Sequence, residues 1–191
     1  MDLNGNKEVL ALRMCAEECK DGWACLLHDL RNHGATQIDL IVSDGHDGLV
    51  AALSEEFSAT PRQRCLLHKQ RNILNAIARR ERGNVQAELV GIWGQPTKSE
   101  ALVHLSAFKA KYAGRYPEAV RSLSEDEEHL LTFYDFPQAM HRHIQTTNAI
   151  ESLFSNVRQR TAQIDVFTTE GSCLTIVWAT IQDIHLHKIS M

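Results

Sequence analysis

The sequence predicts an α/β fold with a helical middle part, and three patterns support this prediction. Residues 38–42 form a short, β-branched and nearly all apolar run that is typical of a buried strand. A polar turn with Gly45 follows, and residues 49–57 then have apolar side chains at helical spacing. Helical spacing also extends over most of residues 63–133. The chain has 191 residues, of which 43% are hydrophobic, so it can bury a substantial core.

The N-terminal part is predicted to contain one strand and one helix. Residues 8–14 alternate loosely after the turn residues 3–6, which is typical of one arm of a hairpin whose other arm would precede Met1. Apolar residues at helical spacing then predict a helix over residues 21–33, and Gly34 is suited to end it.

The middle and C-terminal parts are predicted to be helical, with breaks marked by glycine and proline. We expect breaks at Gly83, at residues 95–97 and at residues 136–137. Residues 146–148 offer an N-cap for a helix whose apolar face would carry Ile150, Phe154 and Val157. A last helix is predicted over residues 169–187. In the middle part, helix is predicted over residues 63–111, interrupted at Gly83 and at residues 95–97, and again over residues 117–133.

Composition excludes several classes of protein. No apolar run approaches the roughly 20 residues that cross a bilayer, and the first residues do not resemble a signal peptide, so we expect a cytoplasmic protein without a membrane partner. Five cysteines are an odd number, and we expect reduced thiols. With 20 Lys and Arg residues against 24 Asp and Glu residues, the net charge of -4 does not by itself favour DNA binding.

Asp44 is the first candidate for a functional residue. It follows the predicted strand directly, at the carboxyl end where open α/β sheets bind ligands. A carboxylate on such a rigid turn is suited to holding a divalent cation. The alternative is a helix cap or turn residue, which is the more common role of a single aspartate after a strand.

Glu151 is the second candidate, and it also has two interpretations. It follows Asn148 by three positions, which is the spacing of a capping box. It also shares one helix face with Ser155 and Arg158, and a carboxylate beside an arginine suits a metal ion and a phosphate. A solvated ion-pair face explains the same pattern.

Cys65 and His68 have half the spacing of a zinc site, and no second close pair follows them. Cys15 and Cys19 could complete such a site only if the fold happened to bring them close to Cys65 and His68. A buried cysteine, with a histidine that orients a turn or touches a substrate, is the alternative. The histidine runs at residues 141–143 and 185–187 lack metal spacing and are expected at the surface.

Four segments together resemble the Mutator-type transposases of bacterial insertion sequences. The order of aspartate, glycine-leucine, glutamine-arginine-cysteine and histidine in the first two segments is specific, and the later two resemble the family's segment around its catalytic glutamate. The segments are SDGHDGL at residues 43–49, QRCLLHKQRN at 63–72, FYDFP at 133–137, and TTNAIESLF at 146–154 with QRT at 159–161.

The resemblance implies a ribonuclease-H-like α/β domain with an Asp-Asp-Glu triad and an all-helical insertion. Asp44 matches the second aspartate and Glu151 the glutamate. The implied division is a ribonuclease-H-like part with the second aspartate over residues 1–62, the insertion over 63–144, and returning helices with the glutamate over 145–191. Cys65, His68, Arg71, Asn148 and Arg158 are the residues implied to bind DNA or to organise the site.

Two departures from the family pattern bear on activity. In the family, the first aspartate of the triad lies on a strand upstream of the turn at residues 3–5. The sequence does not contain that strand, and Asp2 matches a later hairpin position of the family instead. We therefore expect a partial ribonuclease-H-like domain with weak or no activity alone, and the alternatives are a truncated copy and a misassigned start at Met1. The family usually has Phe-Pro where this chain has Phe57 and Ser58.

The implied function is DNA strand cleavage and transfer with Mg²⁺ or Mn²⁺ held by the carboxylates. The implied partners are the transposon ends, target DNA and further copies of the chain. One alternative is a non-catalytic DNA-binding or regulatory remnant that associates with full-length transposase. A zinc-stabilised helical protein is a further alternative.

Overall fold

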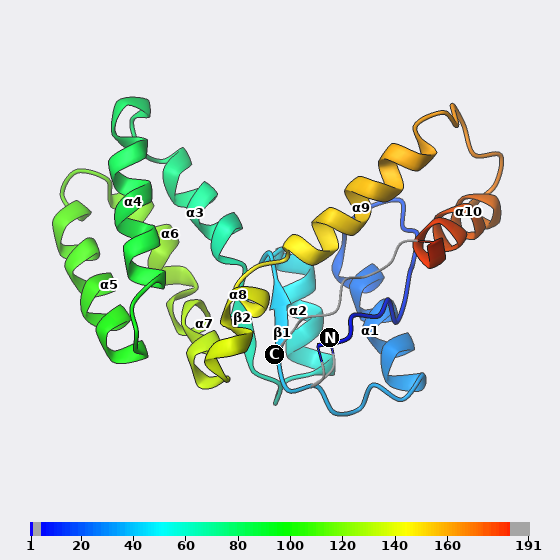
Figure 1. Cartoon of the computed structure of the whole chain (residues 1–191), viewed down its shortest axis with the longest axis horizontal. Helices are drawn as coiled ribbons and strands as arrows, with labels where there is room; N and C mark the ends of the chain where they lie inside the picture. Colours follow the sequence, from blue (N-terminus) through cyan, green and yellow to red (C-terminus); the bar gives the residue numbers. More distant parts are fainter. Residues whose placement is uncertain (2–4, 184–191) are drawn as a thin grey trace. The chain divides into compact units, whose positions relative to one another are not determined.

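A computed structural model describes residue 1 and residues 5–183 of the chain (Figure 1). The backbone divides into two compact units. The helical unit consists of Leu40–Asp44 and Pro61–Thr147. The terminal unit consists of Met1–Asp39, Gly45–Thr60 and Asn148–Met191. The turn residues 3–4, Asp2 and the histidines at 185 and 187 lie outside the described residues.

The helical unit contains a two-stranded parallel sheet of β1 (Ile41–Ser43) and β2 (Arg62–Arg64). The register pairs Ile41 with Arg62 and Ser43 with Arg64. The predicted strand is therefore present but shorter than residues 38–42. The prediction of helix from residue 63 was wrong at its start, because the polar residues of β2 form a strand that has no apolar pattern.

Four helices of the helical unit pack in a ring, α3 against α4, α4 against α5, α5 against α6, and α6 against α3. Thr97 caps α5, because its hydroxyl accepts a hydrogen bond from the Glu100 N–H at 3.2 Å. Pro117 occupies the first turn of α6, where its missing N–H costs nothing. The four helices are α3 (Leu66–Asn75), α4 (Arg82–Trp93), α5 (Lys98–Tyr112) and α6 (Pro117–Glu125).

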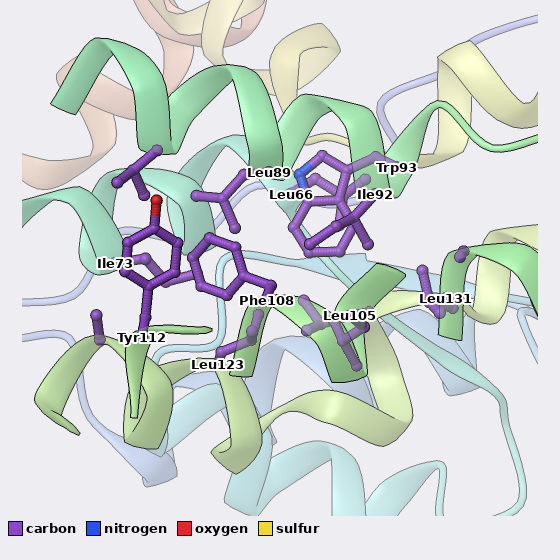
Figure 2. Close-up of a cluster of buried hydrophobic side chains, with 14 of the residues drawn as sticks. Leu66, Ile73, Leu89, Ile92, Trp93, Leu105, Phe108, Tyr112, Leu123 and Leu131 are labelled. Carbon is purple, nitrogen blue, oxygen red and sulfur yellow. The ribbon is translucent and has the colours of Figure 1, made fainter. Parts of the chain in front are cut away.

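The ring encloses one apolar core (Figure 2). Each of the four helices contributes fully buried side chains to it, such as Ile73, Leu89, Leu105 and Leu123. The break predicted at Gly83 was wrong, because Gly83 lies inside α4 and the chain turns earlier, through the short helix η1 (Arg79–Glu81). The break predicted at residues 95–97 is confirmed, since α4 ends at Trp93 and α5 begins at Lys98.

The predicted helix over residues 117–133 is divided into pieces. After α6 the chain forms α7 (Glu127–Leu130) and η2 (Thr132–Asp135), and Leu130, Leu131 and Phe133 enter the core. The break at residues 136–137 is confirmed, and η3 (Gln138–Met140) and α8 (His141–Ile144) follow. His141 is not simply a surface residue, because its Nε2 lies 2.8 Å from the Phe136 carbonyl oxygen and its ring packs on Phe133.

The terminal unit contains four long helices, as the apolar spacing predicts. The helix α1 packs along α2, and α9 packs against α10. The last helix was predicted to continue to residue 187, and its part beyond residue 183 lies outside the described residues. The bounds are α1 (Lys20–Asn32), α2 (Asp47–Glu56), α9 (Asn148–Thr161) and α10 (Glu170–Asp183).

The apolar face predicted for α9 was partly wrong. Leu153 and Val157 are the buried residues and pack with Ile181, whereas Ile150 is 55% and Phe154 39% exposed. Residues 8–14 form no assigned strand within the described part of the chain. All five cysteines are free, as expected. No helix among the described residues has the length and apolar character needed to cross a membrane.

The core of the helical unit gives a stability prediction with a matched control on the same helix. Leu105 of α5 is completely buried, and Leu102, one turn earlier, is 43% exposed. We expect Leu105→Ala to lower the free energy of unfolding by about 3 kcal/mol, because it removes buried methyl groups and leaves a cavity. Leu102→Ala is expected to cost less than about 1 kcal/mol. Urea unfolding checks both values, and equal losses would contradict the described core.

Candidate functional site

The carboxyl ends of β1 and β2 bring two candidate residues to one edge of the sheet. Asp44 follows β1 and Cys65 follows β2. Because Ser43 pairs with Arg64, these two residues come at neighbouring positions after the pair. The Cys65 N–H donates to the Ser43 carbonyl oxygen at 2.7 Å, which continues the parallel pairing to this edge. Sequence alone predicted the position of Asp44, but it did not predict that Cys65 follows a second strand.

Asp44 does not cap the helix that follows it. The N-cap residue of α2 is His46, and α2 begins at Asp47. Gly45 has a φ of 77°, a left-handed conformation that glycine adopts without strain. The chain therefore turns at Gly45, and Asp44 lies at the end of β1 before the turn into α2. His46, and not Asp44, is therefore the N-cap residue of α2, and the turn-residue interpretation of Asp44 stays open beside the metal-ligand interpretation.

Cys65 and His68 form a hydrogen-bonded cluster with Thr147. The thiol of Cys65 is fully buried. The His68 Nδ1 atom lies 3.3 Å from the Cys65 sulfur, and the Thr147 N–H and hydroxyl donate to the same sulfur at 3.4 and 3.3 Å. The Leu66 N–H also donates to the Gln145 carbonyl oxygen at 2.9 Å. The cluster thus fixes the end of the helical unit, residues 145–147, beside the start of α3.

This arrangement fits the interpretation of a buried cysteine and a histidine that orients a turn. The sequence pattern of Cys65 and His68 indicated the pair, but Thr147 was missed as its partner. Thr147 could have been suspected because it directly precedes the helix of Glu151. The Thr147 hydroxyl oxygen also lies 3.4 Å from the His68 Nδ1 atom, so both members of the pair contact Thr147. A structural zinc site would need four ligands.

A buried ion cluster holds β2 and α3 to the segment after α6. The Arg64 Nε atom lies 2.9 Å and the Lys69 Nζ atom 2.5 Å from the same Asp126 oxygen. Arg64 is 7% and Lys69 3% exposed. Lys69 also donates to the Ser122 carbonyl oxygen at 2.7 Å. Burial raises the pKa of Asp126, but the hydrogen bonds from Lys69 and Arg64 outweigh burial and leave that pKa below its ordinary value.

Gln63 reinforces this connection with three buried hydrogen bonds. Its side-chain nitrogen donates to the Arg64 and Leu130 carbonyl oxygens at 2.7 and 3.0 Å. Its side-chain oxygen accepts the Phe133 N–H at 2.8 Å. Gln63 is completely buried, so each of these bonds satisfies a polar group that would otherwise be costly. Gln63, Arg64 and Lys69 therefore support the strand edge, a role that the sequence did not reveal.

Glu151 lies in the first turn of α9, in the terminal unit. Because α9 begins at Asn148, Glu151 is the fourth residue of the helix, whereas a capping box needs the third. Ser155 and Arg158 are exposed like Glu151, as the predicted polar face requires. Asp44 belongs to the helical unit, so the pairing of the two carboxylates stays a prediction.

The remaining predicted site residues are exposed. The capping-box interpretation made Asn148 the N-cap, whereas Asn148 is already the first helical residue of α9. Arg158 lies near the end of α9, and Arg71 lies on α3. Arg71 therefore belongs to the helical unit with Cys65 and His68, and Asn148 and Arg158 belong to the terminal unit with Glu151.

The sequence matches one family over nearly its whole length. The family model described as "Transposase, Mutator family" matches residues 1–189. The transposase for insertion sequence element IST2 of Acidithiobacillus ferrooxidans is 37% identical over 93% of this chain. The transposase for element ISRM5 of Rhizobium meliloti is 32% identical over 97% of the chain, and that for IS6120 of Mycolicibacterium smegmatis is 37% identical over 83%.

The chain spans about half the length of these curated relatives. The matched part covers 60% of the Acidithiobacillus protein, 46% of the Rhizobium protein and 49% of the Mycolicibacterium protein.

The ion cluster predicts how stability depends on pH. The pKa of Asp126 is lower in the folded protein than in the unfolded chain, so the stabilisation is complete above the unfolded value and is lost as pH falls through the folded value. We expect Asp126→Asn to lower the free energy of unfolding at neutral pH by about 3 kcal/mol, because two buried cations lose their counter-charge. Chemical unfolding measured from neutral to acidic pH checks this effect.

Asp135→Asn is the matched control, because Asp135 pairs with Lys98 where both side chains are about half exposed. Such a pair contributes about 0 to 1 kcal/mol. Equal losses in the two variants would mean that the Asp126 cluster does not hold β2 and α3 in place.

Proposed function

This chain belongs to the Mutator family of transposases, and we propose that Asp44 and Glu151 are two of the metal-binding carboxylates of a DNA strand-transfer site. The proposed reaction is cleavage of DNA at transposon ends and joining of those ends to target DNA. The observation that carries the proposal is the edge where β1 and β2 end, with Asp44 after one strand and Cys65 after the other.

The covalent chain supports a shared site for the two carboxylates. Thr147 is hydrogen-bonded to Cys65, which comes at the position next to Asp44 after the paired strand ends. Glu151 follows Thr147 by four residues, and four residues of extended chain span at most about 14 Å. An α-helical start shortens that reach further. The hydrogen bonds to Cys65 therefore limit how far Glu151 can lie from the strand edge.

The donor set fits a hard divalent cation such as Mg²⁺ or Mn²⁺. Carboxylate oxygens are the ligands that these ions prefer, and the rigid strand fixes the position of Asp44. When bound, the metal supplies Lewis-acid stabilisation of the reacting oxygens and lowers the pKa of bound water. Cys65, His68 and Thr147 have a positioning role in this proposal, since they hold the segment that leads into α9.

The polar and basic residues of the site suit the binding of DNA. Asn148 and Arg158 share α9 with Glu151, and all three are exposed. Arginine and amide side chains are typical donors to phosphate oxygens. We further propose that β1 and β2 belong to a ribonuclease-H-like fold. The proposed substrates are transposon ends and target DNA, and we propose that the chain associates with further copies of itself and acts in the cytoplasm.

Metal binding and DNA nicking test the two carboxylates directly. We expect Asp44→Asn and Glu151→Gln each to weaken Mn²⁺ binding about tenfold or more, because each removes a charged oxygen ligand. Mn²⁺ binding is measured by electron paramagnetic resonance, and Mg²⁺-dependent nicking is measured on supercoiled plasmid. Any nicking by the unchanged chain is expected to be lost in both variants.

Asp47→Asn and Glu170→Gln are the matched controls, because both are exposed acidic residues at the starts of helices. They are expected to keep Mn²⁺ binding. Unchanged Mn²⁺ binding in both site variants would contradict the proposal. If every variant also bound DNA equally and none nicked it, the non-catalytic DNA-binding or regulatory protein would be the better account.

A further inference from the structure

The basic residues of this acidic chain are concentrated in one short stretch. Seven of its 20 Lys and Arg residues fall within residues 62–82, together with only one of its 24 Asp and Glu residues. The stretch runs through β2, α3, η1 and the first residue of α4. In a chain with a net charge of -4, a local cluster of positive charges of this kind creates the positive potential that attracts phosphates.

The fold separates this basic stretch into an internal and an outer set. Arg64 and Lys69 are buried on Asp126, and Arg62 lies 3.1 Å from the His129 ring nitrogen. The outer set comprises the other four arginines of the stretch, Arg71, Arg79, Arg80 and Arg82.

The geometry of α3 gives it one polar outer face. Its buried residues Leu66, Lys69, Gln70 and Ile73 lie on one side of the helix. At 100° per residue, the opposite side carries His68, Arg71, Asn72 and Asn75. These four residues are at positions i, i+3, i+4 and i+7 and form a continuous stripe, and α3 contains no acidic residue.

The turn after α3, at η1, carries further arginines. Arg79 and Arg80 are exposed on η1, and Arg80 is 81% exposed at its side chain. The single acidic residue, Glu81, is paired with Arg115, and its Oε1 atom lies 3.5 Å from the Arg80 Nε atom. The Arg82 Nε atom donates to the Ile77 carbonyl oxygen at 3.1 Å, so Arg82 also holds the turn. Within the described residues, Arg71 and Arg79 form no ion pair with an acidic side chain.

We propose that the outer face of α3 and the turn at η1 form a binding surface for the sugar-phosphate backbone of duplex DNA. Arg71, Arg79 and Arg80 are its phosphate-binding residues, and Asn72 and Asn75 donate further hydrogen bonds. The surface begins at His68, so it leads from the proposed strand-transfer site into the helical unit. The inference rests on the proposed function only in taking DNA as the ligand.

The dimensions and chemistry of the surface fit a duplex backbone. The stripe from His68 to Asn75 covers seven residue steps, about 10 Å along the helix axis. Each strand of duplex DNA carries one negative charge per roughly 3.4 Å of the axis, so this length spans about three phosphates of one strand. Guanidinium groups bind phosphate oxygens in a bidentate manner, and this binding to the backbone does not depend on base sequence.

The test is the salt dependence of DNA binding by the full 191-residue chain. Fluorescence anisotropy with a labelled duplex of about 30 base pairs, in EDTA, measures affinity without metal-dependent chemistry. The triple variant Arg71→Ala, Arg79→Ala, Arg80→Ala is expected to bind at least about tenfold more weakly near 50 mM salt. The slope of log affinity against log salt is expected to fall by about 0.9 for each phosphate that is no longer neutralised, about 2.7 in total.

The matched control removes the same number of charges from the same unit at places where each cation faces a carboxylate. Lys98, Lys111 and Arg121 pair with Asp135, Glu88 and Glu118, and their replacement by alanine is expected to leave the slope unchanged. A second triple variant, Arg71→Lys, Arg79→Lys, Arg80→Lys, keeps the charges and is expected to retain most of the slope.

The outcomes separate this inference from the metal-site proposal. A triple variant that binds DNA like the control, or an unchanged chain that binds no duplex, overturns the binding surface. A lower melting temperature with unchanged DNA affinity also overturns it, because the arginines would then serve only the helix ends. If the triple variant loses the salt slope and the unchanged chain does not bind Mn²⁺, the binding surface is supported and only the metal-site proposal is contradicted.

Discussion

The buried cluster of Arg64, Lys69 and Asp126 is the interaction on which the helical unit depends. Two cations that are 7% and 3% exposed meet one carboxylate, and its removal would leave both of them buried without a counter-charge. The cluster joins β2, α3 and the segment after α6 at one point. Gln63 adds hydrogen bonds to the segment from Leu130 to Phe133, so a strand without any apolar residue is held firmly inside a helical unit.

The rigidity of β2 has a direct consequence for the candidate site. Cys65 follows the strand that the cluster holds, and its N–H donates to Ser43 at the end of β1. Asp44 is the next residue after β1, and Thr147 is fastened to the Cys65 sulfur. The buried polar residues thus support the site indirectly. They fix the end of β2, and the end of β2 is hydrogen-bonded to the end of β1. Thr147, in the segment that leads to Glu151, is attached at the same edge.

Sequence reasoning identified the local features and missed those that depend on distant partners. Apolar spacing predicted α1 and α2, and the strand-turn pattern predicted Asp44 at a strand end. β2 was missed because Arg62, Gln63 and Arg64 have no apolar pattern. The partners of Gln63 on the segment from Leu130 to Phe133, and the Asp126 partner of Arg64, lie more than 60 residues along the chain, so no local pattern reveals them. The exposure of Ile150 and Phe154 was missed because helical spacing alone does not say which part of an apolar stripe is covered.

The most direct test is a crystal structure of the chain grown with Mn²⁺, in which anomalous scattering locates the ion. The account predicts Mn²⁺ bound by both Asp44 and Glu151, with the two carboxylates within roughly 8 Å, the reach of ions about 4 Å apart. Carboxylates separated by about 15 Å or more, roughly twice that reach, would contradict the shared metal site. Mn²⁺ bound to neither residue would contradict it equally.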